Sequence, residues 1–233
     1  DRNGLLFMIV ANGAFSATMG VLNTFPPEKA VYIREQQSNA YSPALYLATK
    51  SLAELPVQLG AVLTQTVIVY WITGLVATAD SYFIYVAANL MLSQVGISVG
   101  MAISCGIDSY VVASGTTPLI LIPLMMAAGL LASTERLRPE WYWLEKLSFM
   151  RHSFLLMAKN EFENVGAISC DVAKFGANFC ANQPKNGLEV LESLDMNGDQ
   201  DEPWILWLSL GIILVLGRAL CLFALYSIAG RKN

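Results

Sequence analysis

Long uncharged stretches dominate the chain. Residues 3–27, 55–79, 81–107 and 109–134 contain no Asp, Glu, Lys or Arg. An α-helix rises about 1.5 Å per residue, so each stretch is long enough to cross a hydrocarbon layer of about 30 Å. A fifth stretch, Trp204 to about Gly230, is interrupted only by Arg218, which can snorkel toward the headgroups or face a protein interior. The pattern predicts an all-α membrane protein with five transmembrane helices, at about residues 4–23, 45–76, 81–106, 110–133 and 204–228.

A charged segment, residues 25–43, separates the first two spans and is called the elbow below. We expect Pro26 and Pro27 to end the first helix, because proline lacks the amide donor and restricts the residue before it. A short amphipathic helix over residues 28–36 is expected to follow on the water side. Ser42 is the predicted N-cap of the next helix, with Pro43 at its first position.

Two spacings within the predicted helices indicate contacts. Lys50 and Glu54 are four residues apart, which places them on one helix face as a polar pair near the membrane interface. Gly96, Gly100 and Ser104 recur every four residues in the third span. Small residues at this spacing allow two helix backbones to approach closely.

Composition agrees with a membrane protein, since 55% of residues are hydrophobic and 14% are charged, against about 25% charged in soluble domains. The net charge of -4 is concentrated in residues 135–203, which hold 12 acidic and 7 basic side chains, or -5 in total. A nucleic-acid partner requires a basic surface, so the charge excludes that class.

Basic residues near the span ends predict the orientation. One side collects the elbow and the carboxyl terminus, with Lys29, Arg34, Lys50, Arg231 and Lys232, while the short segments of the other side offer Arg2. Because cytoplasmic loops are enriched in Lys and Arg, the elbow and the carboxyl terminus are predicted to be cytoplasmic and residues 135–203 extracellular.

The extracellular segment has two predicted parts. Apolar residues near a helical repeat from Leu144 to Ala158 indicate a re-entrant or interfacial helix. Cys170 and Cys180 follow and can form a disulfide on an oxidising face, the alternatives being free thiols or a bond between subunits. Cys105 and Cys221 lie within spans and are expected to be inert packing residues.

Other motifs have simpler interpretations. Gly96 to Gly100 matches the G-x-S-x-G pattern of serine hydrolases, but it lies in the middle of a span, and the single histidine, His152, belongs to the extracellular segment. Residues 195–202 resemble a calcium loop, but the glycine is at the wrong position. No phosphate-binding G-x-x-x-x-G-K-[ST] loop occurs, and neither these residues nor one histidine forms a metal site.

A family resemblance covers nearly all of the chain. Its marks are the elbow residues Pro27-Glu28-Lys29 with Arg34-Glu35 and Tyr41-Ser42, then Lys50-x-x-x-Glu54-Leu55-Pro56, Tyr70-Trp71-x-x-Gly74-Leu75, Gly129-Leu130-Leu131, Asn160-Glu161-Phe162 and Gly187-Leu188-Glu189-Val190-Leu191. Together these are similar to the ABC-2 type membrane domain of the G subfamily, the white/brown-complex type, of ATP-binding-cassette exporters. That domain has six helices, so the resemblance implies a fragment, residues 1–233 forming one domain without its first helix and without the nucleotide-binding domain.

The resemblance also implies site residues. Substrate would contact Asn12, Phe15, Ile122 and Met125, below an apolar gate of Leu130 and Leu131; Pro118 departs from the family's pattern in this region. Coupling to the ATPase domain would use Glu28, Lys29, Arg34 and Glu35. No catalytic or metal-ligating residue is implied in this chain.

The function implied is ATP-driven export of lipophilic substrates such as lipids, sterols or xenobiotics, with the full-length protein an ATP-hydrolysing translocase. ATP and Mg would bind the nucleotide-binding domain in cis, and a second half-transporter would complete a homodimer or heterodimer. The protein would contact membrane lipids and lie in the plasma membrane. The alternatives are a gradient-driven transporter or pore, which needs charges deep in its spans, and an intramembrane hydrolase using Ser98.

Overall fold

The computed structural model describes residues 2–38, 41–107, 109–129, 142–166, 186–193 and 202–230. These residues are mostly helical, which confirms the predicted all-α class. In chain order the helices are α1 (Arg2–Gln37), α2 (Pro43–Thr73), α3 (Ala79–Gly106), α4 (Tyr110–Met126), α5 (Tyr142–Leu147), α6 (Phe149–Phe162), α9 (Gly187–Ser193) and α10 (Pro203–Gly230).

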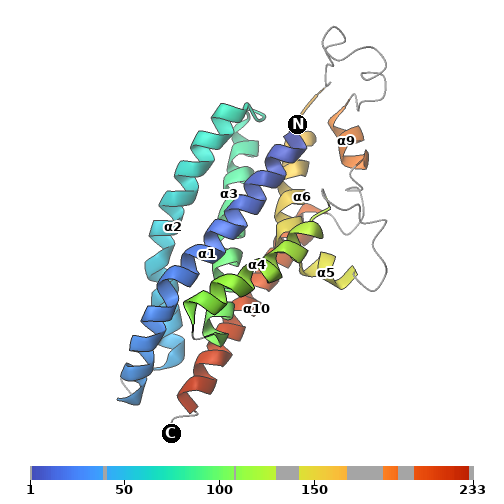
Figure 1. The fold of residues 1–233 in the computed structure, drawn as a ribbon. Helices are drawn as coiled ribbons and strands as arrows, with labels where there is room; N and C mark the ends of the chain where they lie inside the picture. Colours follow the sequence, from blue (N-terminus) through green and yellow to red (C-terminus); the bar gives the residue numbers. More distant parts are fainter. Residues whose placement is uncertain are drawn as a thin grey trace.

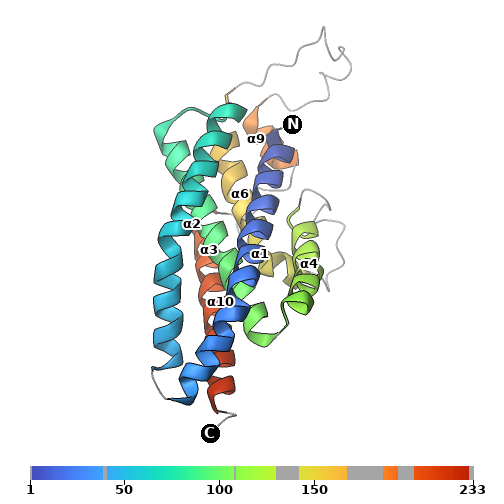
Figure 2. The same cartoon turned by 60° about the vertical axis from the view of Figure 1, so that its left-hand side comes forward.

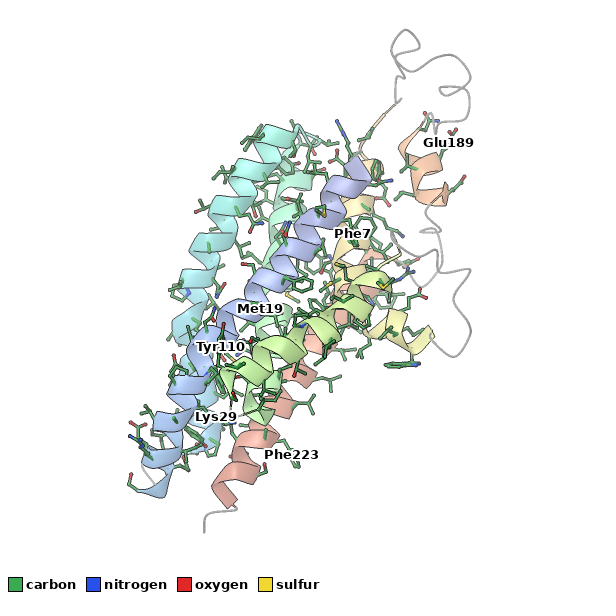
Figure 3. All side chains as sticks on the ribbon, viewed as in Figure 1. Phe7, Met19, Lys29, Tyr110, Glu189 and Phe223 are labelled. Atoms are coloured by element: carbon green, nitrogen blue, oxygen red, sulfur yellow. A yellow bond between two sulfur atoms is a disulfide. The ribbon has the colours of Figure 1, made fainter. Side chains whose placement is uncertain are left out.

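The long helices α1, α2, α3 and α10 run along a common direction, and the two chain termini lie at opposite ends of the bundle (Figure 1). Among the described residues these four are long and apolar enough to cross a membrane. In Figure 2, α2 and α4 lie on opposite sides of α1. Much of the outer surface of α2 and α10 is apolar and exposed, including Trp71, Ile72 and Phe223, as a lipid-facing surface requires; Phe223 is labelled in Figure 3.

The helix in the fourth uncharged stretch is shorter than predicted. It ends at Met126, and Gly129 adopts a left-handed φ of 97° shortly afterwards. Pro118 and Pro123 within it remove two amide donors. The Ser148 hydroxyl donates to the Leu124 carbonyl at 2.6 Å, so a neighbouring segment satisfies a backbone group near this helix end.

The expected helix stop at Pro26-Pro27 is wrong, because α1 continues without interruption to Gln37. Its residues on both sides of the prolines are held by the same buried cluster. Phe25 is 0% exposed and Tyr32 is 1% exposed, and both pack with Val21 and Leu47. Burial of large apolar side chains stabilises by about 1.5–3 kcal/mol each, which is comparable to the cost of a proline in a helix.

The close packing of α1 on α3 confirms the approach of two helix backbones that was predicted from Gly96 and Gly100. A Cβ built on Gly100 would lie 2.8 Å from the Thr18 carbonyl oxygen, and one on Gly96 would lie 3.0 Å from the Ala17 Cβ. The Thr18 hydroxyl donates to the Gly96 carbonyl at 3.2 Å across this contact. Only glycine therefore fits between the two backbones at residue 100 without a shift.

Helix α6 is buried along almost its whole length, packed against α1, α3 and α10. Of the two predicted alternatives, this favours a re-entrant helix over one lying on the membrane surface. Ser42 caps α2 through the Leu45 amide, and Pro43 begins the helix, both as predicted.

The expectation that Cys105 and Cys221 are inert packing residues is wrong, since the structure joins them by a disulfide between α3 and α10. Their Cα atoms are 5.7 Å apart, although 116 residues separate them in sequence. Neighbouring turns of two packed helices bring them together, which spacing along the chain does not reveal. Cys170 and Cys180 lie outside the described residues.

Candidate transport path and coupling site

The four predicted substrate residues lie on α1 and α4, which pack against each other. Phe15 and Met125 are partly buried and pack against the same buried apolar cluster. Asn12 is exposed on α1, and Ile122 is 44% exposed on α4. The arrangement combines apolar side chains with one amide that can form a directional hydrogen bond, which suits lipophilic molecules with a polar group. The predicted gate, Leu130 and Leu131, lies outside the described residues.

The elbow is tied to α2 by ion pairs. Lys50 is buried and pairs with Glu28 of α1, and it also pairs with Glu54 at 2.7 Å, four residues along α2. The Lys50 ammonium lies 5.6 Å from the centre of the Phe25 ring, within the range of a cation–π contact. One lysine therefore joins α2 to α1 through the Glu28 carboxylate and the Phe25 ring, while its pair with Glu54 lies within α2.

Lys29 is buried although the sequence suggested a water-facing residue. It is 3% exposed, and its ammonium donates to the Cys105 carbonyl at 2.8 Å and to the Ser104 carbonyl at 3.4 Å. Figure 3 shows it near the elbow end of α1. These carbonyls belong to the last turn of α3, where a cation is favoured by the helix dipole. Lys29 thus fastens α1 to the carboxyl end of α3.

Three tyrosine rings cluster where the elbow meets α2, a contact that the sequence did not predict. Tyr32 and Tyr46 stack with ring centres 4.6 Å apart, and Tyr41 lies 6.1 Å from Tyr32 and 6.2 Å from Tyr46. The Tyr41 hydroxyl donates to the Glu35 carboxylate. Burial, followed by this hydrogen bond, raises the pKa of Tyr41 to about 12, so the donor stays protonated at neutral pH. Arg34 and Glu35 remain exposed.

Arg218, noted in the sequence as the one charge in the last span, joins three helices. Its guanidinium donates to Ser98 of α3 at 3.0 Å and to Ser51 of α2, and it lies 3.3 Å from the Met101 sulfur. A charge inside a membrane helix is tolerated when it faces the protein interior and finds such partners. Of the two expectations for Arg218, the structure favours an interior position over snorkelling.

The same contact accounts for the hydrolase-like pattern around Ser98. The Ser98 hydroxyl is buried in the middle of α3, where it donates to the Gln94 carbonyl at 3.0 Å and accepts from Arg218. His152 is on α6, with its Nδ1 2.7 Å from the Ser148 carbonyl oxygen. A guanidinium is no general base, so this serine has the surroundings of a packing residue.

A second polar cluster lies at the opposite end of the bundle. Glu161 of α6 is 2% exposed, forms an ion pair with Arg2 of α1, and accepts the Val76 amide at 3.0 Å. Asn160 beside it donates to the Ser81 carbonyl of α3 at 2.8 Å. The sequence drew attention to Asn160-Glu161-Phe162 through the family resemblance, while their partners follow from the tertiary fold.

Comparisons with known proteins agree with this architecture. Residues 1–162 match the ABC-2 type transporter family. Protein white of Drosophila melanogaster is 30% identical over 233 residues, 99% of this chain and 33% of the relative. The ABC transporter ATP-binding protein/permease wht-1 of Caenorhabditis elegans is 26% identical over 199 residues, covering 84% of this chain and 29% of the relative.

The broad substrate specificity ATP-binding cassette transporter ABCG2 of Mus musculus is 28% identical over 212 residues, 89% of this chain and 31% of the relative. The chain thus spans about a third of the length of these relatives. The family match covers more than half of the chain, and the packed apolar helices are those of an integral membrane protein. The chain therefore belongs to the ABC-2 type transporter family and is a membrane domain of the ABCG type.

Proposed function

We propose that this domain is the membrane pathway of an ATP-driven exporter of lipophilic molecules, including lipids, sterols or xenobiotics. The names of two relatives support ATP coupling, since one is an ATP-binding protein/permease and the other an ATP-binding cassette transporter of broad substrate specificity. Phe15 and Met125 pack against one apolar cluster, and Asn12 and Ile122 are exposed on the same two helices, which supports a largely apolar face for such molecules.

One observation carries the coupling part of the proposal: α1 is a single helix from the substrate face to the elbow. Phe15 and Glu28 are 13 residues apart, or about 20 Å along a helix. Beyond Glu28, the helix presents Arg34 and Glu35 to solvent. A force applied to these exposed charges would reach the substrate face through one continuous helix, so ATP-driven movement of a docked domain would bias the pathway.

The proposed transporter also has a nucleotide-binding domain, a second subunit and a defined orientation in the membrane. ATP and Mg bind a nucleotide-binding domain of the same polypeptide, which docks on the elbow, and a second half-transporter pairs with the first. The elbow, residues 25–43, and the carboxyl terminus are cytoplasmic, and residues 135–203 are extracellular, in the plasma membrane. The basic residues of the elbow side support this orientation.

The experiment uses the full-length protein in proteoliposomes, with a fluorescent lipid analogue and a lipophilic dye as probes. We expect ATP-dependent movement of at least one probe. In Glu28→Ala and Arg34→Ala, the amount of probe moved per ATP hydrolysed should fall, while ATP hydrolysis persists. Glu163→Ala, which removes an exposed carboxylate after α6, is the control. Normal coupling in both elbow variants would contradict the coupling role, and absence of ATP-dependent movement of any probe would contradict the exporter.

A further inference from the structure

A small cavity lies between α1, α2 and α3, and α2 lies on the side of α1 away from α4 (Figure 2). Its volume is about 60 Å³. It lies at mid-depth in the bundle, because Gln58 is at the middle of α2 and Ser93 is at the middle of α3. Half of the residues around it are polar: Ser16, Gln58, Gln65, Asn89 and Ser93.

These polar side chains have unused hydrogen-bonding capacity. Ser93 is 6% exposed and Asn89 is 8% exposed. Asn89 donates to the Tyr85 carbonyl at 3.0 Å, while the side chains of Ser93, Gln58 and Gln65 have no hydrogen bond to another described residue. Polar groups at this depth cost free energy when they lack a partner. The cavity is large enough for a small polar group, since a water needs about 10–15 Å³.

The chemistry of the lining selects a neutral group. The amides of Gln58, Gln65 and Asn89 and the hydroxyls of Ser16 and Ser93 supply both donors and acceptors. None of the residues that line the cavity carries a charge. A carboxylate or an ammonium would therefore lose its hydration without an opposite charge to replace it. A hydroxyl or an amide is satisfied by hydrogen bonds alone.

The cavity opens toward the outside of the bundle. Gln65 and Ala61 of its wall are exposed, and α1 and α2 each pack mainly on α3 rather than on each other. Farther along the same side of α2, Ile68 is 52% exposed and Ile72 is 80% exposed. A molecule that reaches the cavity through this opening comes from the hydrocarbon region, and its apolar part can lie over these isoleucines.

We propose that this cavity binds the hydroxyl or amide headgroup of a neutral membrane amphiphile, whose hydrocarbon chain lies along α2. The site is separate from the α1–α4 face and does not depend on transport. Neutral headgroups of long-chain alcohols and of acylamides share the required chemistry. Binding would satisfy the unpaired side chains of Ser93 and Gln58.

The test uses the full-length protein in phosphatidylcholine nanodiscs and a hexadecanol that carries a photoreactive diazirine in its chain. We expect adducts on α2 near Gln58 that excess hexadecanol prevents. In the double variant Gln58→Leu/Ser93→Ala, labelling at equal probe concentration should fall at least fivefold, because each lost hydrogen bond weakens binding severalfold. Gln94→Leu removes an amide from α3 outside the cavity and should leave labelling unchanged.

Three further measurements decide the result. The matching diazirine fatty acid, ionised at high pH, should label the same peptide several times less than the alcohol. Ser93→Ala alone removes one oxygen, so it serves if the double variant misfolds, and its labelling should also fall. Phe15→Ala should leave labelling unchanged, because Phe15 belongs to the α1–α4 face and does not line the cavity. Two results would overturn the proposal. One is the absence of adducts, which is expected if another helix covers the opening. The other is labelling of the cavity variants equal to that of the unmodified protein.

Discussion

Replacing Lys29 tests whether the elbow is fastened to α3 by a buried cation. Methionine keeps the length and the apolar stem of the side chain but removes the ammonium. In Lys29→Met, the Ser104 and Cys105 carbonyls lose the donor that α1 supplies. Arg34→Met is the matched control, because it removes an exposed positive charge from the same helix five residues later.

The expected loss of stability in Lys29→Met follows from the hydrogen bonds of the ammonium. A hydrogen bond to a charged group contributes about 1.5–3 kcal/mol, which includes the favourable position of a cation at a helix carboxyl end. Desolvation of the ammonium offsets part of it, but the variant leaves the carbonyls buried without this donor. For a domain of this size, a loss of about 1.5–3 kcal/mol lowers the melting temperature by about 3–12 °C.

The measurement is thermal denaturation of the full-length protein in detergent, followed by loss of the monodisperse peak in fluorescence size-exclusion chromatography. All variants are heated at one rate, since unfolding of large membrane proteins is governed by kinetics. Lys29→Met should denature at a lower temperature, and Arg34→Met should remain near the unmodified protein. If both variants denature at the temperature of the unmodified protein, the buried cation does not hold α1 to α3.

Three other substitutions test separate parts of the structure. Gly100→Ala should destabilise the protein by about 1–3 kcal/mol in the same thermal assay, since the new Cβ would lie 2.8 Å from the Thr18 carbonyl oxygen. Gly211→Ala is the control and should leave stability unchanged, because no atom lies within 4 Å of its Cβ. Glu161→Gln should lower stability by about 1–3 kcal/mol, because Arg2 loses its negatively charged partner. Unchanged stability in the same thermal assay would contradict this role of Glu161. Phe15→Ala should reduce substrate-stimulated ATPase activity and export of the fluorescent probes; unchanged transport of every probe would remove Phe15 from the substrate face.

Local rules predicted the parts of the fold that depend on neighbouring residues. The Ser42 cap follows from a hydroxyl placed next to Pro43 at a helix start. The Lys50–Glu54 pair follows from the four-residue repeat of one helix face. The close approach at Gly96 and Gly100 follows from a missing Cβ, although the sequence did not say that α1 would fill the space.

Local rules failed where distant segments supply the deciding contact. The Pro26-Pro27 pair resembles a helix stop, but burial of Phe25 and Tyr32 in one cluster keeps α1 continuous. Lys29 resembles a solvated charge, but the carboxyl end of α3 accepts its hydrogen bonds. In both cases the partner is a tertiary neighbour, and its contribution is as large as the local preference that it overrides.

Uncharged runs of bilayer length and several spaced motifs can be read along the chain without its fold, so they were enough to identify a helical membrane protein of the ABCG type. Helix packing determines which charges are buried, which helices share Arg218, and where polar side chains line an open cavity. Those features depend on helix packing between residues as much as 167 positions apart. A pattern of single residues does not specify such pairings, since the same apolar face can pack on several partners.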